Sequence, residues 1–176
     1  MTRIKILLVN CFLLLSVTAI AQTDKDKKIM ADALKAKATL LAKDAGIQEF
    51  FNGAAGYAIF PNVGKGGLII GGASGNGVLY ENGTAMGMTS LKKVNVGLQA
   101  GGQAIIEIIF FQTNSALQKF KQGNYEFSAE ASAIAIDKGT SKDVSYQNGV
   151  AIFTLPKKGL MADVSVGGQK FEYHAF

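Results

Sequence analysis

The chain has 176 residues, 18 Lys and Arg against 13 Asp and Glu, and a formal net charge of +5. The length suits one ordinary domain, and the 48% hydrophobic content excludes a disordered protein because there is enough apolar surface to bury. A single Cys and a single His exclude a disulfide scaffold and a Cys/His zinc site. With 21 Gly, the composition favours a glycine-rich β protein over an enzyme.

Residues 1–21 have the pattern of a secretory signal peptide. Arg3 and Lys5 form a charged start, residues 6–17 are apolar, and Ala19-Ile20-Ala21 places small residues at the cleavage positions. The apolar stretch is shorter than the roughly 20 residues that cross a bilayer, which favours a cleaved signal over an anchor. We therefore expect an exported protein, periplasmic or extracellular, that can lie peripherally on a membrane.

Cleavage would leave a chain without Cys and without Arg, because Cys11 and Arg3 both precede the cleavage position. Stability would then depend on packing rather than on disulfides. Arg is the side chain best suited to paired hydrogen bonds with base edges. We therefore expect no nucleic-acid partner.

Residues 22–46 are predicted to form an amphipathic N-terminal helix, with helical periodicity over residues 24–45. Apolar residues recur at helical spacing on one side and lysines occupy the other side. Gly46 is predicted to end the helix as its C-cap. The pattern fits two interpretations: a surface helix that covers a sheet, or a helix that lies on an anionic membrane. Residues 47–51 are expected to add a helical turn that brings two aromatic side chains to the core.

From residue 56 onward the pattern predicts strands. Asn82-Gly83 and Asn148-Gly149 predict hairpins, because a tight type I′ turn needs positive φ at both central positions. Pro61 is expected to stop the first strand, and Asn114-Ser115 to cap a short helix over residues 116–122. The predicted strands cover residues 57–60, 68–70, 78–81, 84–88, 94–100, 104–111, 125–136, 144–146, 150–155, 160–166 and 169–173.

The order of these elements predicts an α+β fold. Helices do not separate most strand pairs, so parallel βαβ units are not expected. We expect a mainly antiparallel β barrel or sandwich, glycine-rich, with the N-terminal amphipathic helix and one short internal helix. The predicted units are a signal peptide at 1–21, a helix at 22–46 and a β domain at 47–176.

The sequence contains no evident catalytic constellation. His174 lies two residues from the end of the chain, with Glu172 as its nearest acid. The stretch around Ser74 lacks the second glycine of a nucleophile elbow, and the glycines of 64–77 match neither phosphate-binding nor dinucleotide-binding motifs. We interpret these glycines as turns, bulges and sites of close backbone contact. No enzyme activity, cofactor or metal is therefore expected.

Lysines occur in pairs or near-pairs, which suggests a positive surface. These groups are Lys27-Lys28, Lys92-Lys93, Lys119 with Lys121, and Lys157-Lys158. Each Lys near an anionic bilayer contributes roughly 1 kcal/mol, so three or four together would matter at low salt. The alternative is scattered charge that only keeps the protein soluble.

From about residue 51 to residue 176 the chain resembles the SYLF domain. The resemblance rests on the order and spacing of several stretches rather than on any single one. These are Ala55-Gly56-Tyr57-Ala58-Ile59-Phe60-Pro61, Val63-Gly64-Lys65-Gly66-Gly67, Gly75-Asn76-Gly77-Val78, Val96-Gly97, Gly101-Gly102-Gln103, Phe110-Phe111-Gln112-Thr113 and Lys158-Gly159-Leu160-Met161-Ala162. The resemblance implies a lipid-binding module rather than an enzyme. Some members also bind and bundle actin.

The resemblance also implies where lipid would bind. The family's basic amphipathic segment corresponds to residues 24–45 here, and a family lysine corresponds to Lys65. With the turn-borne pair added, the candidate lipid-binding residues are Lys27, Lys28, Lys35, Lys43, Lys65, Lys92 and Lys93. The chain departs from the family in having neither Trp nor Pro in 82–90, and Asp163 where Gly is frequent.

The expected partner is therefore an anionic lipid or membrane surface. The resemblance would also allow actin binding, but an exported protein would not meet actin. The alternative hypothesis is a structural or protein-interaction domain of the cell envelope that has no lipid function. The sequence does not decide whether the N-terminal helix packs on the β domain.

Overall fold

The computed structural model describes residues 23–64, 72–94, 104–123, 133–157 and 168–176. The predicted signal peptide and Lys65 lie outside these residues. So do all or most of the strands predicted at residues 68–70, 94–100, 125–136 and 160–166.

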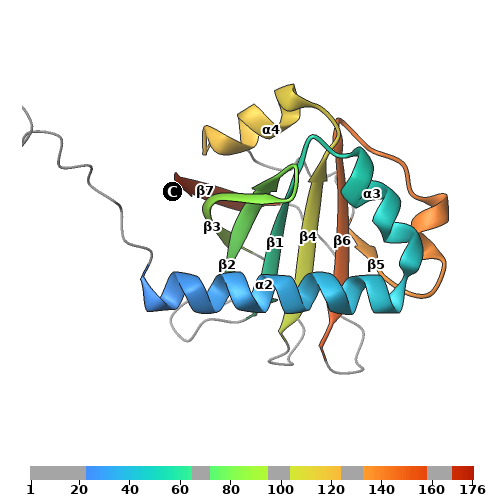
Figure 1. Ribbon diagram of the computed structural model, residues 1–176, viewed down its shortest axis with the longest axis horizontal. Helices are drawn as coiled ribbons and strands as arrows, with labels where there is room; N and C mark the ends of the chain where they lie inside the picture. Colours follow the sequence, from blue (N-terminus) through green and yellow to red (C-terminus); the bar gives the residue numbers. More distant parts are fainter. Residues whose placement is uncertain (1–22, 65–71, 95–103, 124–132, 158–167) are drawn as a thin grey trace, which may run out of the picture.

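Seven strands of the described part form one sheet in the order β5-β6-β4-β1-β2-β3-β7 (Figure 1). They are β1 (Gly56–Val63), β2 (Gly72–Glu81), β3 (Thr84–Val94), β4 (Ile105–Phe111), β5 (Ile134–Ala135), β6 (Val150–Pro156) and β7 (Gln169–Ala175). All neighbours are antiparallel except the short β5–β6 pair. The predicted α+β class and mainly antiparallel sheet are confirmed. The described strands form a single open sheet rather than a closed barrel or a two-sheet sandwich.

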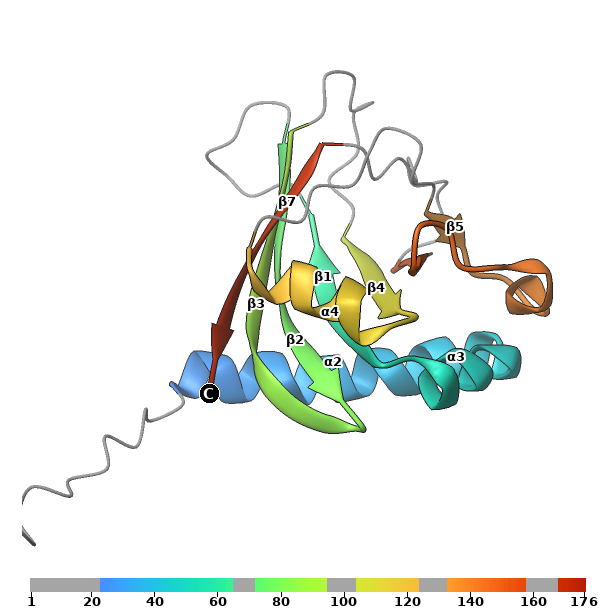
Figure 2. The ribbon, with the colours of Figure 1, turned by 90° about the horizontal axis from the view of Figure 1, so that it is seen from above.

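Helices cover both faces of this sheet (Figures 1 and 2). The helical elements are α2 (Asp24–Lys43), the 3₁₀ turn η1 (Ala45–Ile47), α3 (Gln48–Gly53), α4 (Asn114–Lys121) and the 3₁₀ turn η2 (Thr140–Asp143). Buried residues of α2, η1 and α3 share one core cluster with the sheet, and those of α4 share another. Both predicted helices are therefore present, and each packs on the sheet through its apolar side.

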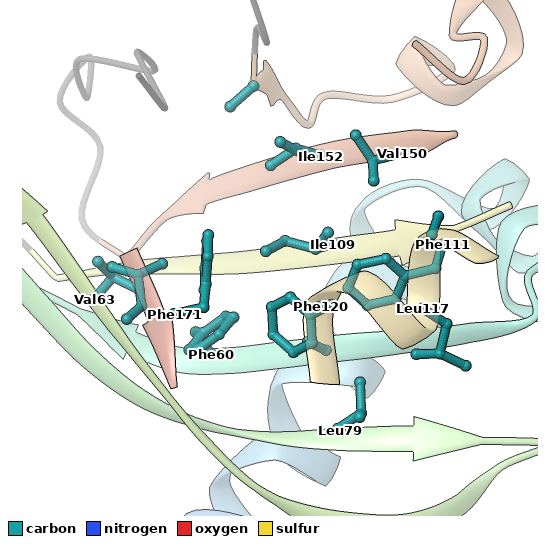
Figure 3. Close-up of a cluster of buried hydrophobic side chains, with 14 of the residues drawn as sticks. Phe60, Val63, Leu79, Ile109, Phe111, Leu117, Phe120, Val150, Ile152 and Phe171 are labelled. Carbon is teal, nitrogen blue, oxygen red and sulfur yellow. The ribbon is translucent and has the colours of Figure 1, made fainter. Parts of the chain in front are cut away.

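The sheet curls around α4. Phe60 of β1 and Phe171 of β7 have ring centroids 5.9 Å apart, although β2 and β3 lie between their strands. Three strand spacings in a flat sheet would separate them by about 14 Å. Phe120 of α4 lies 5.2 Å from Phe171, so the helix fills the concave side (Figure 3).

The two Asn-Gly turns are confirmed. Asn82 and Gly83 have φ of 49° and 78° and join β2 to β3, whereas Asn148 and Gly149 have φ of 51° and 81°. The strand predicted at residues 144–146 is wrong, because only an isolated bridge between Gln147 and Val150 precedes β6. Asn148-Gly149 therefore forms a two-residue turn, but a single bridge takes the place of the first strand of a hairpin.

Two predicted boundaries are wrong. β1 continues through Pro61 to Val63, because the pairing with β4 shifts register between Phe60 and Val63 and the irregularity accommodates a proline. Thr113, not Asn114-Ser115, caps α4, and its hydroxyl accepts from the Ala116 N–H at 3.2 Å.

The predicted C-cap of the first helix is also wrong. α2 ends at Lys43 with Asp44 as its extended C-cap, and Gly46 lies inside η1. The Asp44 carboxylate accepts from the backbone N–H groups of Gly46 and Ser141 at 3.1 and 2.8 Å. A Cβ at Gly46 would lie 2.4 Å from the Ser141 hydroxyl, so glycine here permits close contact with η2. Asp44 thereby joins the end of α2 to η2.

Candidate functional site

The helix α2 is fixed at its start by a capping box. The Thr23 hydroxyl accepts from the Asp26 N–H at 3.2 Å, and the Asp26 carboxylate accepts from the Thr23 N–H at 3.1 Å. Such caps stabilise a helix by about 1 kcal/mol. Asp24 and Asp26 also place negative charge where the helix dipole is positive.

One side of α2 is buried against β1 and β2. Ala33, Ala36 and Leu40 are at most 4% exposed and pack in the core cluster that includes Ile59 and Val78. The sequence left two interpretations of this helix, and the structure supports the one in which it covers a sheet. Any contact with a further partner must therefore use the side of α2 that faces away from the sheet.

That outer side of α2 carries an exposed apolar residue among lysines. Leu34 is 60% exposed, the most exposed of the large apolar side chains in the described residues. Lys27 lies seven residues before it on the same stripe of the helix, with exposed Ala31 and Ala38 alongside. Lys35 adjoins the stripe and is also exposed. The outer face, defined as Lys27, Ala31, Leu34, Lys35 and Ala38, is thus a mixed apolar and basic surface.

Lys28, a third lysine of this helix predicted to bind lipid, lies at the edge of the outer face. Lys28 Nζ forms an ion pair with Asp32 at 2.8 Å, and this hydrogen bond and charge hold the pKa of Asp32 below its ordinary value. Lys27 Nζ lies 3.4 Å from the Asp24 carboxylate, and both side chains are mostly exposed. No ion pair of Lys35 is found among the described residues.

The remaining candidate lysines do not join the outer face. Lys43 is at the far end of α2 and pairs with Asp137 at 2.8 Å, which lowers the pKa of Asp137. Lys92 on β3 pairs with Glu172 of β7 at 2.9 Å and lowers the pKa of Glu172. Lys65 and the side chain of Lys93 lie outside what the structure describes. The structure therefore brings together Lys27, Lys28 and Lys35 out of the seven candidates.

Lys37 on α2 and Lys157 after β6 were not among the candidates, and both contact side chains of β1. Lys37 turns inward, with its Nζ 4.3 Å from the Phe51 ring centroid and 3.2 Å from the Tyr57 hydroxyl, so its charge is used inside the protein. Lys157 follows β6 and donates to the side-chain oxygen of Asn62, and its positive charge also lowers the pKa of Asp32. Nothing local in the sequence connects residue 157 with α2, because their proximity depends on the sheet.

The described helices include none that is long and apolar enough to cross a membrane. The described residues likewise contain no group of three or more His, Cys, Asp or Glu side chains arranged to hold a metal ion.

Comparison with known proteins finds a match to one family, that of the SYLF domain, over just under half of the chain. Residues 92–174, from the end of β3 into β7, match the Ysc84 family, described as "Las17-binding protein actin regulator". The chain is also similar to the Beta cell expansion factor A of Aeromonas veronii, with 28% identity over 123 residues. That match covers 69% of this chain and 46% of the relative, so the chain spans less than half of that protein's length.

Proposed function

Starting from the confirmed resemblance to the SYLF family, we propose that this chain is an exported lipid-binding domain that attaches to anionic membranes through the outer face of α2. Membership of this family supports a non-catalytic domain. The observation that carries the lipid-binding part is the 60% exposure of Leu34 beside Lys27 and Lys35 on a helix whose other apolar side is already buried.

The outer face combines the two interactions that hold interfacial helices on bilayers. Burying a whole Leu side chain stabilises by about 1.5–3 kcal/mol, so the exposed part of Leu34 offers about 1–2 kcal/mol. Each lysine near an anionic surface adds roughly 1 kcal/mol at low salt. The binding free energy available from Leu34, Lys27 and Lys35 together is therefore about 3–4 kcal/mol. A value of this size corresponds to weak and reversible attachment that salt weakens further.

In this proposal α2 remains docked on the sheet when it meets the membrane. The side that packs on β1 and β2 stays buried, because exposing Leu40 and its neighbours would cost more than the outer face gains. Lys28 lies at the edge of the contact, whereas Lys43 and Lys92 contribute less because carboxylates already contact them. Lys65 and Lys93 remain candidates from the sequence.

Vesicle co-sedimentation tests this function. The protein should pellet with vesicles that contain anionic lipid at low salt, pellet less at high salt, and stay in solution with neutral vesicles. Leu34→Asn and Lys35→Gln should each reduce the bound fraction. Lys119→Gln is the matched control, because Lys119 is an exposed lysine of α4, on the opposite side of the sheet.

Folded protein that ignores all vesicles would contradict the proposal. It would favour the alternative, a structural or protein-interaction domain of the envelope. If Lys35→Gln and Lys119→Gln reduce the bound fraction equally, the protein would still be a membrane-binding protein. The outer face of α2 would then not be its contact surface.

A further inference from the structure

We propose that Phe176, which follows β7, is a second apolar anchor that enters the bilayer together with Leu34 of α2. The inference rests on the proposed function, since it adds a contact from a distant part of the chain and fixes how the protein lies on the membrane. It requires no particular lipid headgroup, because both anchors act through apolar burial.

Leu34 and Phe176 are the large apolar side chains that remain exposed in the described part of the chain. Leu34 is 60% exposed and Phe176 is 41% exposed, whereas the other large apolar side chains described are buried or partly covered. A single exposed apolar residue is common on a protein surface. The inference therefore depends on where these two side chains lie relative to each other.

Both side chains belong to the face of the sheet that α2 covers. Phe171 and Tyr173 of β7 point to the opposite face, because they pack in the cluster that α4 completes. Side chains alternate between the two faces along a strand, so Phe176, three residues after Tyr173, belongs to the face of α2. The Phe176 N–H donates to the Met86 carbonyl at 3.1 Å, so the backbone is still paired with β3 at this position.

Leu34 lies on the side of α2 that faces the start of β1. Lys37 identifies this side, because its Nζ is 3.2 Å from the hydroxyl of Tyr57, the second residue of β1. Leu34 precedes Lys37 by three residues, a spacing that places two side chains on the same side of a helix. The exposed side chain of Leu34 therefore points towards the end of the sheet where β1 begins.

The strand pairing places Phe176 at that same end of the sheet. Tyr57 pairs with Tyr80 of β2, and Tyr80 pairs with Ala85 of β3. Ala175, the residue before Phe176, pairs with β3 two positions after Ala85. The end of the chain, marked C, lies above the N-terminal half of α2 in Figure 1 and at the same level as this helix in Figure 2. The two anchors thus share one face and one end of the sheet.

A bilayer is the partner that suits two separate anchors. A stable protein–protein contact buries about 800 Å² on each partner over a continuous complementary surface, which two isolated side chains do not provide. A bilayer accepts each apolar side chain separately, and the exposed Lys27 and Lys35 beside Leu34 complement anionic lipid. The protein would then rest on the membrane along α2 and the end of β7, with α4 directed away from it.

The exposed part of Phe176 sets the size of the expected effect. Burying the 41% that is exposed should raise affinity for a bilayer by about three- to eightfold. Phe176→Asn should therefore weaken binding by this factor to vesicles of phosphatidylcholine with phosphatidylglycerol. In the double variant Leu34→Asn with Phe176→Asn, the two losses should multiply, because independent contacts contribute additively to the binding free energy. Urea unfolding of each variant checks that these exposed substitutions leave the fold intact.

Tryptophan fluorescence tests whether each position enters the bilayer. The sequence contains no Trp, so a single introduced Trp reports its own position alone. Leu34→Trp and Phe176→Trp are made in the full chain and mixed with the same vesicles carrying brominated acyl chains, which quench Trp inside the bilayer. Both should be quenched. Lys119→Trp is the matched control, because Lys119 is exposed on α4, on the opposite side of the sheet, and it should not be quenched.

Quenching at both anchor positions but not at the control, with three- to eightfold weaker binding by Phe176→Asn, supports the second anchor. Quenching of Leu34→Trp alone, with unchanged binding by Phe176→Asn, overturns the second anchor and leaves the proposed function in place. Equal quenching of Lys119→Trp, or quenching of Phe176→Trp alone, overturns the shared contact of α2 and β7. Folded protein that binds no anionic vesicles overturns both the anchor and the proposed function.

Discussion

A disulfide between positions 46 and 141 would test whether the end of α2 is held against η2. A Cβ built at Gly46 lies 3.7 Å from the Cβ of Ser141, close to the mean of about 3.8 Å in natural disulfides. We expect Gly46→Cys with Ser141→Cys, in a Cys11→Ser background, to oxidise readily. A crosslink across a loop of roughly 100 residues is worth up to about 4.7 kcal/mol by chain entropy, and measured disulfides give about 2–4. We expect about 3 kcal/mol.

Urea unfolding of the oxidised and reduced double variant measures this gain. With a denaturant slope of about 1–3 kcal/mol/M, a gain of about 3 kcal/mol raises the unfolding midpoint by about 1–3 M. Equal midpoints, or thiols that stay free under oxidation, would refute the close approach of η1 and η2. The same pair tests the docked helix. Oxidised protein should bind anionic vesicles as well as reduced protein does, and loss of binding on oxidation would mean that the end of α2 must move.

Three other substitutions follow from burial and contact, two of them with a matched control substitution, and each is measured by urea unfolding. Leu40→Ala should lower the free energy of unfolding by about 2–5 kcal/mol, because the Leu40 side chain of α2 is fully buried against the sheet. Leu34→Ala, at an exposed position of the same helix, should change it by less than about 0.5 kcal/mol. Gly77→Ala should destabilise strongly, since its Cβ would lie 2.4 Å from a backbone oxygen of β1, while Gly53→Ala meets nothing within 4 Å and should be tolerated. Burial raises the pKa of Asp44, but backbone N–H hydrogen bonds outweigh this and lower the pKa below its ordinary 3.8. The stabilisation by Asp44 is therefore complete above pH 3.8 and is lost as the pH falls through the lower pKa of the folded state. Over that pH range the Asp44→Asn variant should lose less stability than the unchanged protein does.

The parts of the fold that the sequence predicted correctly depend on local chemistry. Asn82-Gly83 adopts the positive φ that the pair favours, and the helical periodicity of α2 identified the side that the sheet buries. The errors came where distant contacts outweigh local preference. Pro61 stays in a strand because the pairing with β4 is irregular there, and α2 ends before Gly46 because Asp44 is held by η2, far along the chain.

The candidate site was predictable in part for the same reason. Helical spacing placed Lys28 and Lys35 on the polar side of one helix, and both are exposed in the structure. The docking of α2 depends on contacts with β1 and β2, which no local pattern reveals. The position of Lys157 was beyond reach of sequence reasoning, because only the register of β1, β4 and β6 brings it beside Asn62 of β1.

The ion pairs change what a count of lysines means for binding. In the sequence every lysine adds one positive charge, but Lys28, Lys43 and Lys92 each contact a carboxylate at 2.8–2.9 Å. An exposed ion pair stabilises by about 0–1 kcal/mol, which is nearly what one lysine gains at an anionic surface. A lysine that leaves its carboxylate to contact a membrane therefore gains little net binding free energy. Lys35 takes part in none of the ion pairs found among the described residues, so it has no such interaction to give up, and it adjoins Leu34. Affinity for a membrane should therefore be concentrated at Leu34 and Lys35 rather than spread evenly over the lysines.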